Sequence, residues 1–215
     1  MEDLTIIYYS ANAEKPEFEQ KIIKNLKESA NGIPIVSITH KAIDLGINVQ
    51  VGEQPMCYSN LWKQQLAGLK LAKTRFCVTA EADCLYPPDY FKFIPLREDL
   101  VYRYNNVWCY WKRKPAFYKK PSCEGAQMCG RKYWIERLEQ MLDGHKGWKP
   151  METLASTLVT KIFPDEDKVS WGGDPVITFK TGDSIGGKTS LVKGSKVQSL
   201  QYWGTKELIY NKMFT

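Results

Sequence analysis

The first 80 residues alternate between strand-like and helix-like segments, and this order restricts the folds open to the chain. Leu4–Ser10 is a run of β-branched and aromatic residues, which favours a strand. Pro16 then opens a helical pattern that continues to about Ser29 and ends at Asn31-Gly32. Strands that alternate with helices are typical of parallel sheets. We therefore predict an α/β fold with a mainly parallel central sheet, with further strands at 33–39, 47–51 and 75–80 and a second helix at 58–72.

The second half of the chain has a mixed pattern. Long strand-like runs at 100–111 and 125–129 precede a predicted helix at 131–142. We expect a further helix at 150–161, an extended segment at Val176–Lys180 and a short helical segment at 206–212. The 215 residues fit one domain, residues 1–215, because no repeat or linker divides them.

Composition and charge exclude several classes of protein. With 43% hydrophobic and 25% charged residues, the chain is neither disordered nor fibrous. No apolar run reaches the roughly 18 residues of a membrane span, and Met1-Glu-Asp does not open a signal peptide, so we expect a cytoplasmic protein. Six cysteines without a CxxC pair and only two histidines argue against a zinc ribbon and a multi-histidine metal site. The net charge of +6 suits an anionic partner.

Residues 182–189 read GDSIGGKT, which matches the letter pattern of a phosphate-binding P-loop. In a P-loop nucleotide phosphotransferase, a helix begins at the Lys-Thr pair, and a neighbouring strand supplies a metal-binding Asp. Only 26 residues follow Thr189, and Gly194 interrupts any helix there. A P-loop domain is therefore disfavoured. The two remaining interpretations are a glycine-rich surface loop and a loop that closes over an anionic ligand.

Two acidic residues follow the predicted buried strand at 75–80. Glu81 and Asp83 are two positions apart, and extended geometry places such side chains on one face, roughly 7 Å apart. In open α/β sheets, ligands bind at the carboxyl ends of the strands, where two carboxylates can hold a hard divalent ion. Pro87-Pro88 is expected to end the strand and start a short helix with Asp89 in its first turn. Spacing alone leaves open whether the acids bind metal or are ordinary loop residues.

The segment Ala80–Pro87, AEADCLYP, resembles the ExD or DxD signature of GT-A fold glycosyltransferases, particularly small family 2-like members with an AEDD-x-LYP form. Residues 51–54, 58–60 and 68–74 resemble the segment before that acidic strand, and Glu124–Arg131 resembles the acceptor-side strand and loop. The resemblance covers about residues 4–142. It implies a Rossmann-like GT-A domain, with a nucleotide-sugar-binding half at 1–99 and an acceptor-binding half at 100–215.

The resemblance implies roles for the acidic residues. Asp83 would bind Mn²⁺ or Mg²⁺ on the donor diphosphate, and Glu81 would assist through the metal, a water or the ribose. Ala82 departs from related sequences, which often carry an Asp there. The C-terminal metal-binding His of the family is also missing, and Asp183 is the candidate replacement. The implied contacts of the nucleotide-sugar, for which a UDP-sugar is the expected donor, are Ser10, Asn12, Glu53, Asn60, Glu81, Lys180 and Lys188.

Transfer to a hydroxyl by an inverting mechanism needs a carboxylate that takes the acceptor proton. Glu152, at a predicted helix start, resembles the position of the family's catalytic acid, and Glu124 is the second candidate. The alternative is that each is an ordinary acidic residue, one at a helix N-terminus and one on an exposed strand.

Residues 102–120 read YRYNNVWCYWKRKPAFYKK, with seven aromatic residues, six basic residues and no acid. Such a segment could stack bases and follow phosphates, so we hypothesise DNA with a hydroxymethylated pyrimidine as the acceptor. Glycan, lipid-linked and protein acceptors remain alternatives, as do a non-catalytic nucleic-acid-binding module and a twisted hairpin with buried aromatics. The candidate acceptor contacts are Tyr104, Trp108, Trp111, Arg113 and Gln127.

Overall fold

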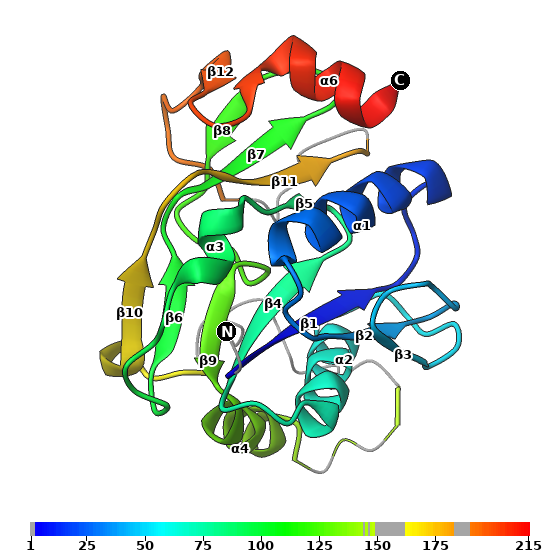
Figure 1. The fold of residues 1–215 in the computed structure, drawn as a ribbon, viewed down its shortest axis with the longest axis vertical. Coiled ribbons are helices and arrows are strands. Elements are labelled where there is room, and N and C mark those ends of the chain that lie inside the picture. Colours follow the sequence, from blue (N-terminus) through cyan, green and yellow to red (C-terminus); the bar gives the residue numbers. More distant parts are fainter. Residues whose placement is uncertain (1–2, 144, 146, 149–161, 183–189) are drawn as a thin grey trace.

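The computed structural model describes residues 3–143, 145, 147–148, 162–182 and 190–215. Its largest feature is a sheet of seven strands: β1 (Leu4–Ser10), β2 (Ile35–Thr39), β3 (Ile47–Gln50), β4 (Phe76–Glu81), β6 (Val101–Tyr104), β9 (Gln127–Gly130) and β10 (Lys168–Trp171). Their order across the sheet is β10-β6-β9-β4-β1-β2-β3 (Figure 1). Strand β9 is antiparallel to both neighbours, and every other adjacent pair is parallel. The predicted α/β fold with a mainly parallel central sheet is confirmed.

Strand β1 is buried along its whole length, as expected of a central strand in a parallel sheet. Successive side chains of a strand point to opposite faces. Leu4, Ile6 and Tyr8 accordingly pack in the core on one face, and Ile7 and Tyr9 pack in the core on the other. One short apolar run therefore contributes to two cores.

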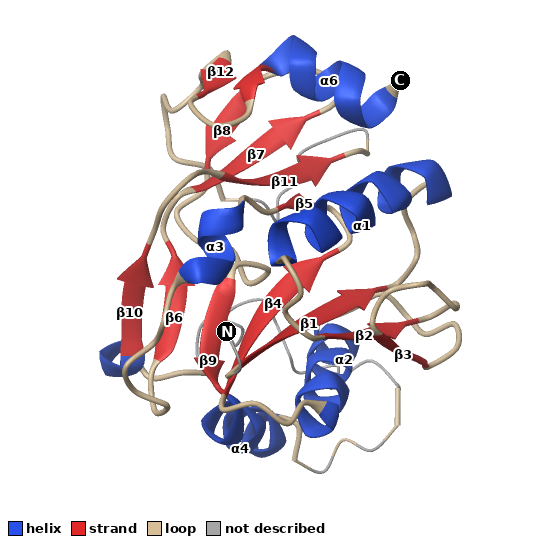
Figure 2. Ribbon diagram, viewed as in Figure 1, coloured by secondary structure: helices blue, strands red, loops and turns tan. Residues whose placement is uncertain are grey.

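Helices cover both faces of the large sheet (Figure 2). The first core includes residues of α1 (Pro16–Ala30) and α3 (Pro88–Lys92), and the second includes residues of α2 (Tyr58–Leu71) and α4 (Arg131–Met141). Helix α1 ends at Asn31 in the left-handed region, followed by Gly32 with φ of 85°, which agrees with the predicted stop. Among the described residues, no helix combines the length and the apolar character needed to cross a membrane.

A second sheet lies beside α1 and contains β5 (Cys84–Leu85), β7 (Val107–Trp111), β8 (Phe117–Lys119) and β11 (Val176–Lys180), in the order β5-β11-β7-β8. Helix α6 (Lys206–Phe214) packs on it, after the short pair β12 (Ser199–Leu200) and β13 (Gly204–Thr205). Phe18 of α1 contacts Phe179 of β11 at a ring distance of 5.3 Å and Phe214 of α6 at 5.4 Å. Helix α1 therefore packs against both sheets.

The strand-like run at 100–111 is two strands in different sheets, so its interpretation as one long run was wrong. Asn105 and Asn106 separate β6 from β7, and their backbone groups bond to Trp171 O and to Val176 N. These two bonds hold the chain where it leaves the large sheet for the second sheet. The sequence patterns also missed β5, β8, β10 and the short 3₁₀ helix η1 (Asp165–Asp167). The helix predicted at 150–161 lies outside the described residues.

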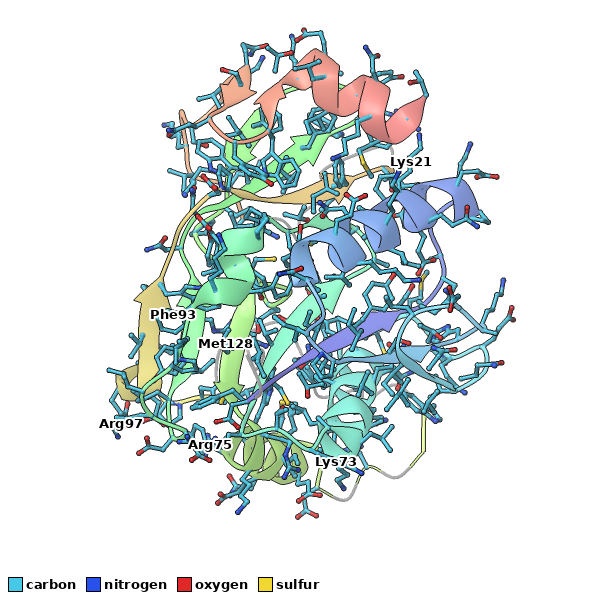
Figure 3. The ribbon with its side chains drawn as sticks, viewed as in Figure 1. Lys21, Lys73, Arg75, Phe93, Arg97 and Met128 are labelled. Carbon is cyan, nitrogen blue, oxygen red and sulfur yellow. The ribbon has the colours of Figure 1, made fainter. Side chains whose placement is uncertain are left out.

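Charged side chains gather where β4 begins. Arg75 lies 3.3 Å from Asp3 and 3.1 Å from Glu98, and Figure 3 shows Arg75 and Lys73 at this end of the molecule. From here β4 runs to Glu81, and the chain then enters the second sheet at Cys84. The carboxyl end of β4 is therefore close to the junction of the two sheets.

Candidate active site

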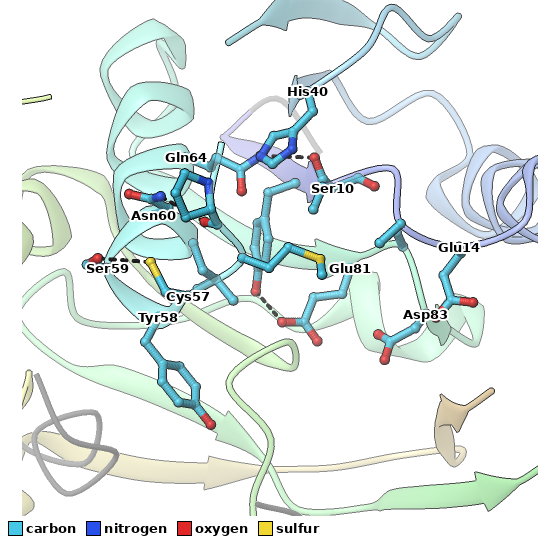
Figure 4. Close-up of a pocket in the computed structure, with 17 residues that line it drawn as sticks. Ser10, Glu14, His40, Cys57, Tyr58, Ser59, Asn60, Gln64, Glu81 and Asp83 are labelled. Atoms are coloured by element: carbon cyan, nitrogen blue, oxygen red, sulfur yellow. Dashed lines mark hydrogen bonds between the residues drawn. The ribbon is translucent and has the colours of Figure 1, made fainter. Parts of the chain in front are cut away.

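A pocket of about 540 Å³ opens at the carboxyl edge of the large sheet (Figure 4). Strands β1, β2 and β4 are parallel neighbours, so their carboxyl ends meet there. This is the usual position of ligands in open α/β sheets. The lining consists of Tyr9, Ser10, Ala11, Ala13 and Glu14 at and after the end of β1, His40 after β2, Glu81, Ala82 and Asp83 at the end of β4, and residues 55–61 and 64 around the start of α2.

Two buried amides of α2 fix the wall of the pocket. Gln64 Nε2 donates hydrogen bonds to Ser10 O and Ile38 O, both at 3.0 Å, and thereby ties the ends of β1 and β2 to the helix. Asn60 Nδ2 donates to Pro55 O and Trp148 O, both at 2.8 Å. Both side chains are buried, at 4% and 2% exposure, so these bonds hold the strand ends and the loop before α2 in place.

The Glu81 carboxylate is held between β1 and the loop before β9. Tyr9 Oη donates a hydrogen bond of 2.8 Å to Glu81 Oε1. A Cβ atom at Gly125 would lie 2.1 Å from Glu81 Oε2, so this position has no room for a side chain. Asp83 is fixed from the other side, because its carbonyl accepts a 2.8 Å bond from Phe179 N of β11. The two sheets together bring the two acids into one pocket.

Acidic groups are concentrated around Glu81. Burial raises the pKa of the Glu81 carboxyl, and nearby Cys123 and Asp83 raise it further. The pKa of Cys123 is lowered, because Cys84 donates a hydrogen bond to it and Lys120 lies close, with Nζ 3.6 Å from Sγ. Burial alone would lower the pKa of Lys120, but the acidic groups around it raise it. Lys120 alone does not neutralise these acidic groups. A divalent cation would relieve the repulsion that remains among them.

The donor atoms at the end of β4 suit a divalent metal ion. One carboxylate oxygen each from Glu81 and Asp83 and the Cys84 sulfur all lie within 4.8 Å of one another. Carboxylate oxygens are the preferred ligands of Mg²⁺ and are also suited to Mn²⁺. The predicted acid pair is thus spaced as metal binding requires. Asp183, the expected third ligand, lies outside the described residues.

The structure places some of the expected donor contacts in the pocket and others elsewhere. Ser10 and Asn60 line it with the acid pair. Asn12 lines a neighbouring cavity, where its side chain bonds to Glu19 and to Lys41 N. Glu53 does not line the pocket, since its side chain is 86% exposed and faces Lys41. Lys180 ends β11 outside the pocket lining, and Lys188 lies outside the described residues.

Of the two candidate catalytic carboxylates, the structure describes Glu124 only, and Glu152 lies outside the described residues. Glu124 Oε1 is 2.8 Å from Nη1 of Arg103 on β6, and this ion pair is largely buried. Its other carboxylate oxygen has no hydrogen-bond partner among the described residues. Glu124 directly precedes Gly125, which contacts Glu81, so it lies near the acid pair.

Two expected acceptor contacts are buried, which corrects that part of the prediction. Tyr104 is 1% exposed, and its hydroxyl donates a 2.6 Å bond to Asp174 O, so its ring belongs to the core. Gln127 is also 1% exposed, within β9. Trp108 and Trp111 are partly exposed, and Arg113 is exposed at the turn between β7 and β8. The 102–120 segment thus includes a hairpin with several buried aromatics, which was the alternative interpretation of its pattern.

Several residues of the site carried no sequence signal. His40 lines the pocket, and burial lowers its pKa. Glu14 also lines it, with a pKa raised by burial and with Thr181 as a hydrogen-bond donor at 2.8 Å. Gln64 and Cys84 likewise follow no motif. Each residue reaches the site because a different strand or helix ends there, and a linear pattern does not record that.

The residues that directly follow the glycine-rich segment do not support a P-loop. In a P-loop, the helix that starts at Lys188-Thr189 would continue through residues 190–198. Those residues contain a turn and an isolated bridge between Val197 and Phe117, and they form no helix. Of the GDSIGGKT segment itself, only Gly182 lies within the described residues, and the residues that follow the segment lack the helix that a P-loop requires.

No protein-family model and no curated protein matches the sequence. Solved structures do match the fold. S. aureus TarS, residues 1–349 in complex with UDP-GlcNAc, superposes with a TM-score of 0.52 at 10% identity, over 85% of this chain and 60% of that 1–349 chain. The glycosyltransferase GlyE of Streptococcus pneumoniae TIGR4 superposes with a TM-score of 0.51 at 12% identity, over 80% of this chain and 46% of GlyE.

The chain thus spans 60% of the TarS 1–349 chain and 46% of the GlyE chain, which limits the likeness to one part of each. Identities this low are informative about the fold only. The sheet order, the helices on both faces and the pocket at the carboxyl edge agree with that likeness. The chain therefore has the GT-A-like, Rossmann-type fold found in glycosyltransferases.

Proposed function

We propose that the chain is a metal-dependent glycosyltransferase that moves a sugar from a nucleotide-sugar to a hydroxyl acceptor. The observation that carries the proposal is the pair Glu81 and Asp83, held together at the carboxyl end of β4 inside a pocket. A donor diphosphate needs its negative charge balanced by a metal ion, and two carboxylates at this point can hold such an ion. A site for a ligand without that charge would not need them. The GT-A-like fold supports the same interpretation.

The pocket suits a nucleoside diphosphate in size and polarity. Its volume of about 540 Å³ is within the usual range for small-molecule sites. Ser10, His40 and Asn60 offer polar groups on one side, and the acid pair lies on the other. TarS has been solved with UDP-GlcNAc, so a UDP-sugar is the first donor to test. The lining comes from the first half of the chain, which supports a donor-binding role for residues 1–99.

The metal, Mn²⁺ or Mg²⁺, would be held by Asp83 and Glu81. When bound, it would act as a Lewis acid that stabilises the leaving diphosphate. Tyr9 and Gly125 keep the Glu81 carboxylate in place, and the bond from Phe179 N keeps the Asp83 backbone in place. Lys180 and Lys188 remain candidates for charge compensation at the diphosphate, and Asp183 remains a candidate ligand.

A carboxylate that accepts the acceptor proton has to lie near the donor's reacting carbon. Glu124 is held by Arg103 beside the loop that contacts Glu81, and this placement supports it as the base. Glu152 is the other candidate. The two assignments differ in outcome, because only the variant of the true base loses transfer while it keeps donor binding.

For the acceptor, we propose DNA that carries a hydroxymethylated pyrimidine. The support is a stretch without acidic residues from 100 to 123, together with partly exposed Trp108 and Trp111 and exposed Arg113 on or next to β7. Transfer of labelled sugar from UDP-sugars to hydroxymethylated DNA, with unmodified DNA as control, tests this choice. Label that enters a glycan, lipid or protein fraction and never the DNA would replace this acceptor with another.

The experiment for the proposed function is calorimetric titration of UDP into the chain with and without Mn²⁺. We expect binding that requires Mn²⁺ and weakens at least about tenfold in Asp83→Asn. Asp89→Asn is the matched control, because Asp89 lies on α3 and pairs with Lys92 at 3.0 Å. The proposal would be contradicted if the UDP affinity were the same with and without Mn²⁺ and the same in the wild type and Asp83→Asn. ATP with Mg²⁺ serves as the rival ligand, and tight ATP binding that survives Asp83→Asn would favour a phosphotransferase.

A further inference from the structure

The thiol of Cys84 is in contact with both acids of the candidate metal site. Cys84 Sγ lies 3.4 Å from Asp83 Oδ1 and 3.8 Å from Glu81 Oε2. One donor atom from each of the three residues fits within 4.8 Å, a spacing at which a single ion can contact all three. The side chain of Cys84 is fully buried, and the sulfur lies beside the acid pair without lining the pocket itself.

The second sheet fixes the position of this sulfur. Cys84 begins β5, and it pairs with Thr178 of β11 in an antiparallel register. The next residues along the two strands are also joined, because Phe179 N donates a hydrogen bond to Asp83 O. Asp83 and Cys84 are therefore held by one strand, β11, while Glu81 belongs to β4 of the large sheet. The three donors converge because the chain changes sheets between residues 81 and 84.

We propose that Cys84 is the third protein ligand of the metal, and that its sulfur makes the site prefer Co²⁺ and Zn²⁺ to Mg²⁺. The inference rests on the proposed function only in taking the acid pair as a metal site. Thiolate is a soft donor that suits Zn²⁺ and related ions, whereas Mg²⁺ is held by oxygen. On binding, the Cys84 S–H proton is released to solvent and a bond from sulfur to the metal forms.

A different role for Cys84 has to be separated from this one. A thiol that only donates its one hydrogen bond to a neighbouring acidic group would orient that group without touching the ion. Serine keeps such a donor and removes the sulfur, so Cys84→Ser distinguishes ligand from positioning group. Cys77→Ser is the matched control, because Cys77 is equally buried, on β4, and packs in the core beneath α2 and α4.

The test is titration of the whole chain with Co²⁺, with UDP absent and then present, followed in the near ultraviolet. A thiolate bound to Co²⁺ gives a charge-transfer band, so we expect this band in the wild type and in Cys77→Ser and its loss in Cys84→Ser. Competition with Zn²⁺ and Mg²⁺ gives the ratio of the two affinities. We expect this ratio to fall in Cys84→Ser by more than the roughly 10- to 100-fold that loss of an outer partner of a ligand costs.

Two results would overturn the inference: Co²⁺ binding without the band, and a band that persists in Cys84→Ser. If the band persists there and disappears in Cys123→Ser, the sulfur ligand is Cys123. Melting curves of each variant show whether it is folded. No sugar donor or acceptor enters this experiment. If the protein shows the charge-transfer band but transfers no sugar, only the proposed function is contradicted. If it binds UDP in a Mn²⁺-dependent way but shows no band, only the role of Cys84 is contradicted.

Discussion

Gly125 and Glu81 are in direct contact, and this contact determines where the carboxylate lies. The Cβ of an alanine at position 125 would lie 2.1 Å from Glu81 Oε2, which is far inside van der Waals contact. Glu81 is also bonded to Tyr9, so it can move away only by giving up that bond. The missing side chain at position 125 therefore has a role in the site.

We predict that Gly125→Ala displaces Glu81 and weakens Mn²⁺-dependent UDP binding by about tenfold or more, as loss of a ligand's support does. The overpacking should also lower the free energy of unfolding by about 1–3 kcal/mol. Calorimetry and denaturant titration measure the two effects. Gly182→Ala is the control, because a Cβ there meets no atom of the described residues within 4 Å. Equal binding by the two variants would contradict the assigned role of Glu81.

Gln64 is a buried residue whose side-chain amide donates hydrogen bonds to two strands, β1 and β2. We predict that Gln64→Ala lowers the free energy of unfolding by about 1–3 kcal/mol, since Ser10 O and Ile38 O each lose a donor in the interior. UDP affinity should fall as well, because Ser10 and His40 line the pocket. Gln20→Ala, at an exposed position of α1, should change neither quantity. Denaturant unfolding of both variants checks this.

At the scale of elements, the close packing of α2 on β1 and β2 depends on a small residue. Gly68 lies in the last turn of α2, where a Cβ would meet Ile7 Cγ2 at 2.7 Å and Ile38 Cγ1 at 3.4 Å. Ile7 is fully buried, and its β-branched side chain has few alternative rotamers. The glycine therefore lets the helix approach the sheet, although glycine is a poor helix former.

Two opposed effects decide the outcome of Gly68→Ala. Helix propensity favours alanine by about 1 kcal/mol, whereas overpacking of a full core costs about 1–3 kcal/mol. We predict that the overpacking dominates and that the variant unfolds at a lower temperature. Lys70→Ala, which removes an exposed ion pair with Glu139, should change the free energy of unfolding by less than about 1 kcal/mol. A raised melting temperature for Gly68→Ala would contradict the packing argument.

At the scale of the whole molecule, the net charge of +6 is unevenly placed along the chain. Between Asp99 and Glu124 the sequence has six basic residues and no acid, and this stretch supplies β7 and β8. Arg113 and Lys114 lie exposed in the turn that joins these strands. If this face binds the DNA backbone, affinity should depend steeply on salt, because each neutralised phosphate releases counterions.

We predict that Arg113→Ala with Lys114→Ala lowers the slope of log affinity against log salt by about 2, one for each lost phosphate contact. The control is Lys73→Ala with Lys132→Ala, which removes the same charge at exposed positions near the start of β4 and in α4. Fluorescence anisotropy with a hydroxymethylated duplex measures both slopes. Identical slopes would mean that net charge alone, and no particular face, attracts DNA.

The sequence by itself determined most of the local structure of the first 81 residues. The bounds of β1, α1, α2 and β4 agree with the patterns to within about a residue, because apolar periodicity and the Pro and Gly signals act over one turn or one strand. The acid pair was also predicted, since residues two apart at a strand end stay together in any fold that keeps the strand.

Only the tertiary structure decided which residues share the site with that pair. Cys84 reaches the acids through pairing with β11, nearly 100 residues away, and Gln64 lines the same pocket from α2, where it bonds to the ends of β1 and β2. The break at Asn105-Asn106 likewise depends on hydrogen bonds to residues 171 and 176. Such pairings are long-range, and the residues involved carry no local pattern of their own. The sequence therefore predicted the acids, and the junction of two sheets brought them together with a sulfur ligand candidate and a pocket.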